Sequence, residues 1–181
     1  MIIFRPRTCP WLLSSSSDRR DLDIVDGTGP HQGLGAHYSR RTPGSKTFTG
    51  VGQEVVLVHD SGAAVWAVVR QKTPSKRGSG ASRGRSGKTD SAARYVWRNM
   101  LFRRLPSCPD RASDLIKSAT TSTYLLWEWK YGALPEEPLR TEVDAARVGS
   151  PNPGYCYKVA EWTAFKKVGS KIYLRAPEDR P

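Results

Sequence analysis

The stretch LRTEVDAARVGSPNPGYCYKVAEW, residues 139–162, contains signals for a strand, a turn and a short helix in succession. Apolar and polar residues alternate over 139–144, which is the period of a half-buried strand. The breakers and helix-capping residues in GSPNPG, residues 149–154, then turn the chain into a helix that ends near Ala160. Asp144 therefore lies at the C-terminal end of a strand and close to the start of a helix, which is where ligands bind in α/β sheets.

This stretch also resembles a known family. The string SPNPGYCYKVAEW, residues 150–162, resembles the last helix and strand of GNAT-fold N-acyltransferases, in which a helix tyrosine precedes a small-residue turn and an aromatic residue. Together with HYSRR at residues 37–41, it is more narrowly similar to the Mom-like phage DNA-modification proteins. The family usually has glycine at the turn after the helix, where this chain has Glu161.

The resemblance runs from His37 to Leu174 and implies a single α/β domain of the GNAT type, with a mixed, twisted sheet flanked by helices. A chain of 181 residues, 38% of them hydrophobic, can fill one domain core. Residues 37–175 would form the catalytic domain. We expect residues 1–36 to be a flexible N-terminal arm, because 14–36 hold a serine run, mixed charges and scattered glycines with few residues to bury.

Local patterns predict the remaining elements. The β-branched runs at 53–59 and 63–70 flank Asp-Ser-Gly and predict an antiparallel hairpin. The other predicted elements are a strand at 95–105, a helix from about 109 to 131, and a final hairpin with basic outward positions at 163–167 and 171–175.

The chain carries a net charge of +12, from 29 Lys and Arg against 17 Asp and Glu. Such a charge attracts a polyanion, and we expect duplex DNA as the partner. Residues 72–94 hold seven Lys and Arg against Asp90 alone, with almost nothing apolar, and predict a flexible basic loop that follows phosphates. An arginine-rich genome and a plain solvated linker are the competing explanations. The predicted nucleic-acid contacts are Arg40, Arg41, Lys76, Arg77, Arg83, Arg85 and Lys88.

No apolar run reaches the length of a membrane span, so we expect a soluble protein of the cytoplasm, that of the host cell if the chain is phage-encoded, without a membrane partner. Whether the chain forms a homodimer is left open by the sequence. The three cysteines, Cys9, Cys108 and Cys156, are odd in number and widely spaced, which favours neither a disulfide framework nor a Cys-x-x-Cys metal site.

On the residues alone, His37 beside Tyr38 is more typical of a partly buried pair than of a metal site, because one imidazole has no further ligand at a metal-binding spacing. The resemblance implies the opposite. A His-Tyr pair at this place, with an Asp on a later strand, is implicated in binding iron in the Mom-like proteins, which gives His37, Tyr38 and Asp144 here. The competing interpretation is that Asp144 caps the following turn and His37 packs against Tyr38 without a metal.

The resemblance further implies Tyr157, Asp144 and Ser39 as catalytic residues. Two-residue spacing places Tyr155 and Tyr157 roughly 200° apart on a helix, so we expect only one of them to face the site, and Tyr157 is the predicted one. GNAT enzymes hold the pyrophosphate of acyl-CoA at a glycine-rich turn before the long helix, but the turn RRLPSCPD has no glycine, and its prolines remove N–H donors. The predicted cofactor contacts are Arg103, Arg104 and Ser113, with acetyl-CoA or another acyl or glycyl donor as the ligand.

Three functions are consistent with these observations. The family implies an enzyme that modifies the exocyclic N6 amine of adenine in duplex DNA with a carbamoylmethyl group, which protects phage DNA from restriction. The first alternative is an acyl-CoA-dependent N-acetyltransferase acting on a small amine or a pre-modified base, with Tyr157 as general acid. The second alternative is a nucleic-acid-binding module that has the fold without the chemistry.

Overall fold

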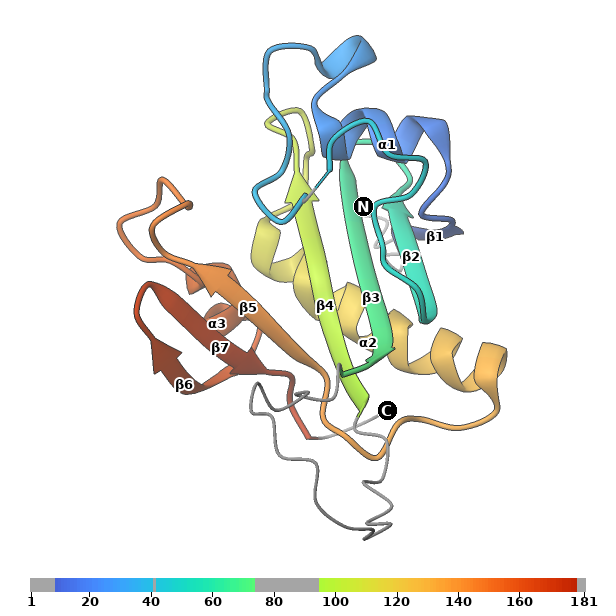
Figure 1. The fold of residues 1–181 in the computed structure, drawn as a ribbon, viewed down its shortest axis with the longest axis vertical. Coiled ribbons are helices and arrows are strands. Elements are labelled where there is room, and N and C mark those ends of the chain that lie inside the picture. The colour runs from blue at the N-terminus through green and yellow to red at the C-terminus, as the bar shows by residue number, and fades with distance from the viewer. Residues whose placement is uncertain (1–8, 41, 74–94, 179–181) are drawn as a thin grey trace, which may run out of the picture.

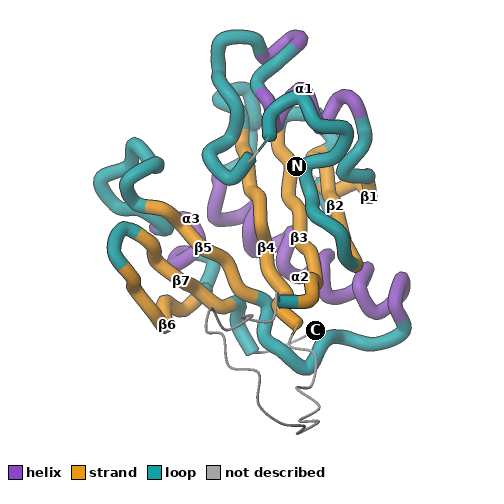
Figure 2. The backbone as a smooth tube through the Cα atoms, viewed as in Figure 1, coloured by secondary structure: helices purple, strands orange, loops and turns teal. Residues whose placement is uncertain are grey.

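The computed structural model describes residues 9–40, 42–73 and 95–178, and shows a seven-stranded mixed sheet flanked by helices (Figures 1 and 2). The strand order is β1-β2-β3-β4-β5-β7-β6. The predicted α/β class is confirmed. The elements are β1 (Trp11–Ser14), α1 (Arg19–Asp26), the 3-10 helix η1 (Gly29–His31), β2 (Gln53–His59), β3 (Ala64–Lys72), β4 (Tyr95–Arg104), α2 (Ala112–Tyr131), β5 (Arg140–Asp144), α3 (Tyr155–Val159), β6 (Thr163–Val168) and β7 (Lys171–Arg175).

One pair of neighbouring strands differs from all the others in the sheet. The pair β4 and β5 is parallel, and every other pair is antiparallel. The helix α2 connects β4 to β5, as a parallel connection requires. Only Arg98 with Arg140 and Asn99 with Thr141 are in register between them, and the two strands diverge beyond that point (Figure 1).

The core lies between the sheet and α2, which runs behind the sheet in the view of Figure 1. Alternate residues of β4 face α2, and Trp97 packs its ring 5.2 Å from that of Trp127. Both rings are at most 1% exposed. The indole N–H of Trp66 donates to the Thr123 hydroxyl at 2.9 Å, so this buried donor is satisfied. Burial of such large rings is the main favourable term in folding.

Most of the predicted elements are confirmed. The hairpin of β2 and β3 forms where the β-branched runs lie, and the predicted final hairpin forms as β6 and β7. The helix predicted from about residue 109 begins at Ala112 and ends at Tyr131, before Gly132, whose positive φ of 82° stops it. The helix predicted to end near Ala160 forms as α3, which begins at Tyr155 directly after Gly154 with φ 77°.

The prediction of a loose segment at 14–36 is wrong for residues 19–26, which form α1, whereas residues 32–36 hold no helix or strand. The helix α1 forms there because Asp18 accepts the N–H of Arg20 at one end and Gly27, with φ 67°, ends the helix at the other. Ile24 and Val25 are buried, and β1 pairs with β2. Few apolar residues are needed, since the helix only has to cover part of the sheet. Residues 1–8 of the predicted arm lie outside the described residues.

Residues 37–40 form a turn in which the Arg40 N–H donates to the His37 carbonyl at 2.8 Å. The predicted basic loop, from residue 74 onward, lies outside the described residues, as do Arg41, Lys76, Arg77, Arg83, Arg85 and Lys88. Within the described ranges, no helix combines the length and the apolar character needed to cross a membrane.

Candidate functional site

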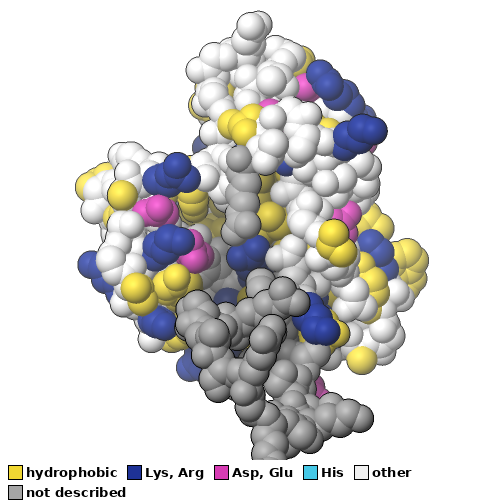
Figure 3. All heavy atoms as spheres, in the orientation of Figure 1, with side chains coloured by type: hydrophobic (Ala, Val, Ile, Leu, Met, Phe, Trp, Pro, Cys, Tyr) yellow, Lys and Arg dark blue, Asp and Glu magenta, His cyan; other side chains and the backbone are white. Residues whose placement is uncertain are grey.

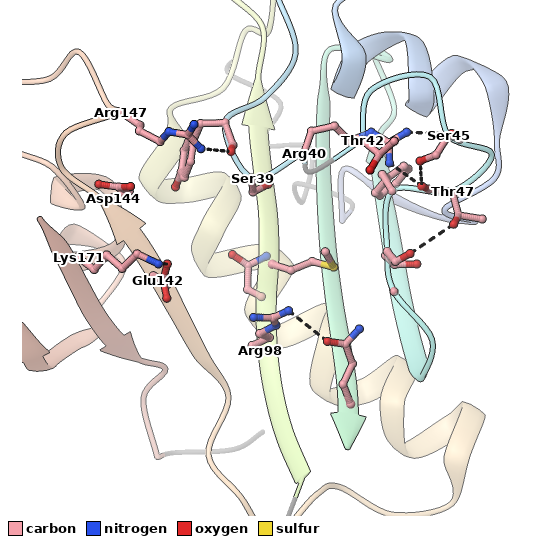
Figure 4. A pocket seen from close by; sticks show the side chains of 17 residues that line it. Ser39, Arg40, Thr42, Ser45, Thr47, Arg98, Glu142, Asp144, Arg147 and Lys171 are labelled. Carbon is pink, nitrogen blue, oxygen red and sulfur yellow. Dashed lines mark hydrogen bonds and ion pairs between the residues drawn. The ribbon is translucent and has the colours of Figure 1, made fainter. Parts of the chain in front are cut away.

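A pocket of about 470 Å³ opens on the sheet face opposite α2, where β4 and β5 diverge (Figure 4). This volume is in the range of roughly 300–1,000 Å³ that is usual for small-ligand sites. One wall consists of residues from 38–50 together with β3 and β4, and the other consists of β5, the turn after it and the start of β7. Its charged residues are Arg40, Arg98, Arg147, Lys171, Glu142 and Asp144.

The two carboxylates reach the pocket because side chains alternate along β5. Thr141 and Val143 are buried in the core, so Glu142 and Asp144 point to the other face. On β7, Lys171 lies opposite Asp144 and forms a 2.6 Å ion pair with Glu142. The pocket therefore offers cations and acceptor-only carboxylates side by side, a set that can bind an anionic group and an amine at once.

Asp144 is held by hydrogen bonds at the end of β5. Its Oδ1 accepts the hydroxyl of Ser170 at 2.7 Å and the N–H of Ala146 at 3.2 Å. These bonds, led by that of Ser170, lower the pKa of Asp144 below its usual range, so the carboxylate is ionised at neutral pH. The capping of the following turn, which the sequence offered as the competing role, is present in the structure.

Tyr38 lies beside Asp144 although more than a hundred residues separate them. Arg147 donates from Nη1 to the Tyr38 carbonyl at 3.0 Å and so fastens the two pocket walls together. Burial, followed by the nearby carboxylates of Asp144 and Glu142, raises the pKa of Tyr38 to about 12. The phenol is therefore neutral at physiological pH and can donate a hydrogen bond into the pocket.

His37 packs with its ring 4.4 Å from that of Tyr38 but turns its nitrogens elsewhere. Its Nδ1 lies 2.8 Å from the Ser39 hydroxyl and accepts the Ser39 N–H at 3.3 Å, and the ring is also hydrogen-bonded to the Phe102 backbone. Burial and the charge of Arg103 lower the pKa of His37 to about 4. His37 is thus a neutral imidazole, and Ser39, which lines the pocket, separates it from the pocket space.

This arrangement does not present His37, Tyr38 and Asp144 as three free ligands. Tyr38 and Asp144 adjoin, but Nδ1 of His37 is already an acceptor for Ser39, and a metal would have to displace that contact. Within residues 9–40, 42–73 and 95–178, no group of three or more His, Cys, Asp and Glu side chains could hold a metal ion. Iron binding by this set stays a prediction.

Tyr157 lies behind the pocket rather than in it. Its side chain is buried, and its hydroxyl donates to Oδ1 of Asn99 at 2.6 Å. Asn99 itself lines the pocket, and its amide donates to the carbonyls of Ala67 and Leu101. Burial raises the pKa of Tyr157 well above its usual value. Tyr155 is 58% exposed, so the two tyrosines do face different ways, but Tyr157 meets the pocket only through Asn99.

A β-bulge lies next to Asn99. The register of β3 against β4 passes from Ala67 with Leu101 to Val68 with Asn99, so Met100 is the extra residue. Bulges break the ladder locally and re-aim side chains, and they are common beside active sites. Met100 lines the pocket at the level where β4 leaves β5.

The predicted cofactor contacts lie away from the pocket. Arg103 donates to the carbonyls of Val25, Gly35 and Leu34, and thereby ties the N-terminal segment to β4. Arg104 donates to the carbonyls of Cys108 and Asp110 within the turn before α2. Ser113 lies in the first turn of α2. Both guanidiniums therefore have structural partners in the place where the sequence suggested phosphates.

Arg40, a predicted nucleic-acid contact, is also engaged in the structure. Its guanidinium forms a buried ion pair with Asp26, and the two side chains are 4% and 6% exposed. It donates further to the carbonyls of Ser45 and Thr47. Arg40 thus holds the wall formed by residues 38–50 in place, and its remaining surface faces the pocket rather than the solvent.

Several pocket residues were not predicted. Glu142 could have been found, because a strand that presents Asp144 presents Glu142 on the same face. Arg98 and Gln71, which share a 3.1 Å hydrogen bond, lie on neighbouring strands whose pairing had to be known first. Arg147 and Lys171 depend on how the chain turns after β5 and returns as β7.

Comparisons of the chain with protein-family models, with curated proteins and with solved structures found no match. Its function is therefore inferred from the pocket and from the charge of the chain.

Proposed function

We propose that the protein is a transferase that modifies the exocyclic N6 amine of adenine in duplex DNA, with a carbamoylmethylation-like chemistry that protects the DNA from restriction. The observation that carries this proposal is the composition of the pocket, in which Glu142 and Asp144 adjoin Arg98, Arg147 and Lys171 in a chain with a net charge of +12. A nucleotide brings an amine and an anion together, and the pocket offers partners for both.

Modification in this pocket would require the adenine base to leave the DNA double helix. Chemistry on a base inside a duplex needs the nucleotide to be flipped out, and the pocket is large enough for a small ligand and lies at the surface. The carboxylates can accept hydrogen bonds from the exocyclic amine, while the cations pair with phosphates beside it. A base held by these contacts would present its reacting nitrogen to the pocket that Ser39 and Tyr38 also line.

The polar groups of the chain then have distinct roles. As the amine forms a bond to the transferred carbon of the acyl or glycyl donor, the bond from that carbon to the leaving group breaks, and the leaving group departs with the electron pair. The amine proton passes to Ser39 while the hydroxyl proton of Ser39 passes to Nδ1 of His37. With a pKa of about 4, His37 is a weak base, so positioning and charge stabilisation contribute more than proton abstraction. Tyr38, as a neutral phenol, donates a hydrogen bond to the leaving group. No step is assigned to iron, because His37 is engaged by Ser39.

The acyl-CoA-dependent N-acetyltransferase is the second candidate, and the shape of the sheet favours it. Beyond Asn99, β4 is no longer in register with β5, so backbone groups on that edge can pair with the amides of an extended acyl donor. Tyr157 does not serve as its general acid in this arrangement, since Asn99 separates it from the pocket. The third candidate, a DNA-binding module without chemistry, rests on charge alone.

Mass spectrometry of nucleosides from plasmid DNA of expressing cells tests the proposal. We expect a modified adenine nucleoside with the unchanged chain and a strongly reduced amount with Ser39→Ala or Asp144→Asn. The control is Tyr155→Phe, an exposed position outside the pocket. Unmodified DNA together with tight DNA binding would favour the binding module, and acetyl-CoA binding by calorimetry with an acetylated amine would favour the second candidate. Metal analysis after anaerobic purification tests iron separately.

A further inference from the structure

The strands β5, β7 and β6 form an outer face that carries aromatic and basic side chains, with Glu142 and Asp144 on its β5 strand, on the same side of the sheet as the pocket. Strand register places Arg140 opposite Arg175, Glu142 opposite Tyr173, and Lys166 opposite Tyr173 from the other side. Yellow apolar and dark blue basic side chains lie together over this part of the molecule (Figure 3). We call this face the hairpin platform, and its members are Arg140, Phe165, Lys166, Lys171, Tyr173 and Arg175.

The aromatic rings and the cations of the hairpin platform contact one another. The centroids of the Phe165 and Tyr173 rings are 6.4 Å apart. The Arg140 guanidinium lies 5.4 Å from the centre of the Phe165 ring, and the Lys166 ammonium lies 6.0 Å from that of Tyr173. Phe165 is 43% exposed although it is a large apolar residue, and every residue of β6 is exposed.

The hairpin platform continues into the pocket. Lys171 belongs to both, because it lines the pocket and lies two residues from Tyr173 on the same face of β7. Carboxylates pair with two of the four platform cations, Glu142 with Lys171 and Glu178 with Arg175. Arg140 and Lys166 lie over the rings instead. A ligand strand that leaves the pocket past Lys171 would therefore meet the Tyr173 and Phe165 rings together with Arg140 and Lys166, while Glu142 stays paired with Lys171.

We propose that the hairpin platform is a stacking surface for unpaired bases of the DNA strand whose target base occupies the pocket. Aromatic rings and arginine planes are the surfaces on which unpaired bases stack, and the cations between them neutralise the phosphates. The inference rests on the proposed function in taking DNA as the substrate, and it adds that the strand is opened beyond the flipped base. Protection of the edge strand by lysines and a bulge is the competing explanation.

Fluorescence anisotropy with a short, labelled single-stranded oligodeoxynucleotide tests the hairpin platform. We expect Phe165→Ala and Tyr173→Ala each to weaken binding by about fivefold or more. Arg140→Ala and Lys166→Ala should each reduce the slope of log K against log salt by about 0.7. The matched control is Trp129→Ala, which removes a ring that is 73% exposed on α2, on the other side of the sheet. It should bind as the unchanged chain does.

Three outcomes would overturn the inference. Unchanged affinity in both aromatic variants, with circular dichroism showing a native fold, would leave the rings without a role in binding. An equal loss in Trp129→Ala would show that any exposed aromatic residue matters. A change of oligomeric state in the platform variants would assign the face to a contact between two copies of the chain.

Nucleoside mass spectrometry separates the two proposals. If the unchanged chain produces no modified nucleoside but loses oligonucleotide binding in Phe165→Ala and Tyr173→Ala, the hairpin platform stands and the proposed function fails. If the DNA is modified and oligonucleotide binding is the same in all variants, the proposed function stands and the hairpin platform fails.

Discussion

The hydroxyl of Tyr157 donates a 2.6 Å hydrogen bond to Oδ1 of Asn99, so a buried tyrosine supports the floor of the pocket from behind. We expect Tyr157→Phe to lower the free energy of unfolding by roughly 1–2 kcal/mol, because Oδ1 would keep only the longer bond from Thr141. Urea unfolding measures this change. Tyr155→Phe, at an exposed position, is the control and should stay within about 0.5 kcal/mol of the unchanged chain. If Tyr157→Phe abolished DNA modification without any loss of stability, Tyr157 would instead take part directly in the reaction.

His37 predicts how stability depends on pH. Its pKa of about 4 in the folded chain lies below the ordinary value of 6.5, so below pH 6.5 the unfolded chain takes up a proton that the folded chain does not. Stability should therefore be fully present above pH 6.5 and should fall by up to about 3 kcal/mol as the pH drops towards 4. Denaturant unfolding at several pH values measures the loss. In His37→Gln this part of the pH dependence should disappear, whereas His31→Gln, in η1, should retain it.

The ion pair of Arg40 with Asp26 predicts a large penalty when one partner is removed. Burial alone would raise the pKa of Asp26, but the bonds from Arg40 and from the Gly44 N–H outweigh it, and the pKa is lowered. Asp26→Asn should cost about 3 kcal/mol, because a buried guanidinium loses its counter-charge. Thermal and urea unfolding measure this loss. Arg19→Ala breaks the exposed pair with Asp23 and should cost less than about 1 kcal/mol.

The backbone conformation of Glu161 predicts that a glycine at this position would stabilise the fold. Glu161 is the one described non-glycine residue with a positive φ, at 68°, in the turn between α3 and β6 where the resembled family has glycine. Glu161→Gly should stabilise the fold by up to about 1 kcal/mol, because glycine adopts this conformation without strain. Lys117→Ala controls for the exposed ion pair that Glu161 makes with Lys117. A lower melting temperature in Glu161→Gly alone would contradict the prediction.

The basic residues beyond β3 predict the salt dependence of DNA binding. Replacing Lys76, Arg77, Arg83 and Arg85 by alanine should flatten the slope of log K against log salt for duplex DNA, because fewer counterions are released. Titrations at several salt concentrations measure the slope. An unchanged slope would mean that this segment is only a linker.

Local patterns were sufficient for most strands and for α2, because alternation and turn residues act over a few neighbours. The hairpins at β2 and β3 and at β6 and β7 are examples. The helix α1 was missed because its local signals are weaker. Its composition is polar, and its signals include Asp18 and Gly27 at its two ends. Between them lies a short apolar stripe of Leu22, Ile24 and Val25, which is easy to overlook because it is only three residues in a polar segment.

The pocket could be predicted only in part. Tyr38, Ser39, Arg40 and Asp144 do line it. The family resemblance was the signal for Tyr38 and Ser39, whereas the end of a predicted strand also indicated Asp144 and the basic charge indicated Arg40. The insertion of β5 between β4 and β7 brings Glu142 and Lys171 to the same place, and no local pattern encodes that order. Spacing separated Tyr155 from Tyr157, but which of them is buried depends on how α3 packs on Trp66 and Trp162.

The two registered residue pairs between β4 and β5 make this seam the weakest line in the sheet. Within strands β1 to β4, and within strands β5 to β7, all neighbours are joined by antiparallel hydrogen bonds. Amide hydrogen exchange should therefore resolve two cooperative units. We expect the unit of β5, β7 and β6 to open at the lower free energy. Because each unit contributes one wall of the pocket, a bound ligand would contact both units and hold them together. Its occupancy should then slow exchange in β7, on the far side of the seam from Tyr38.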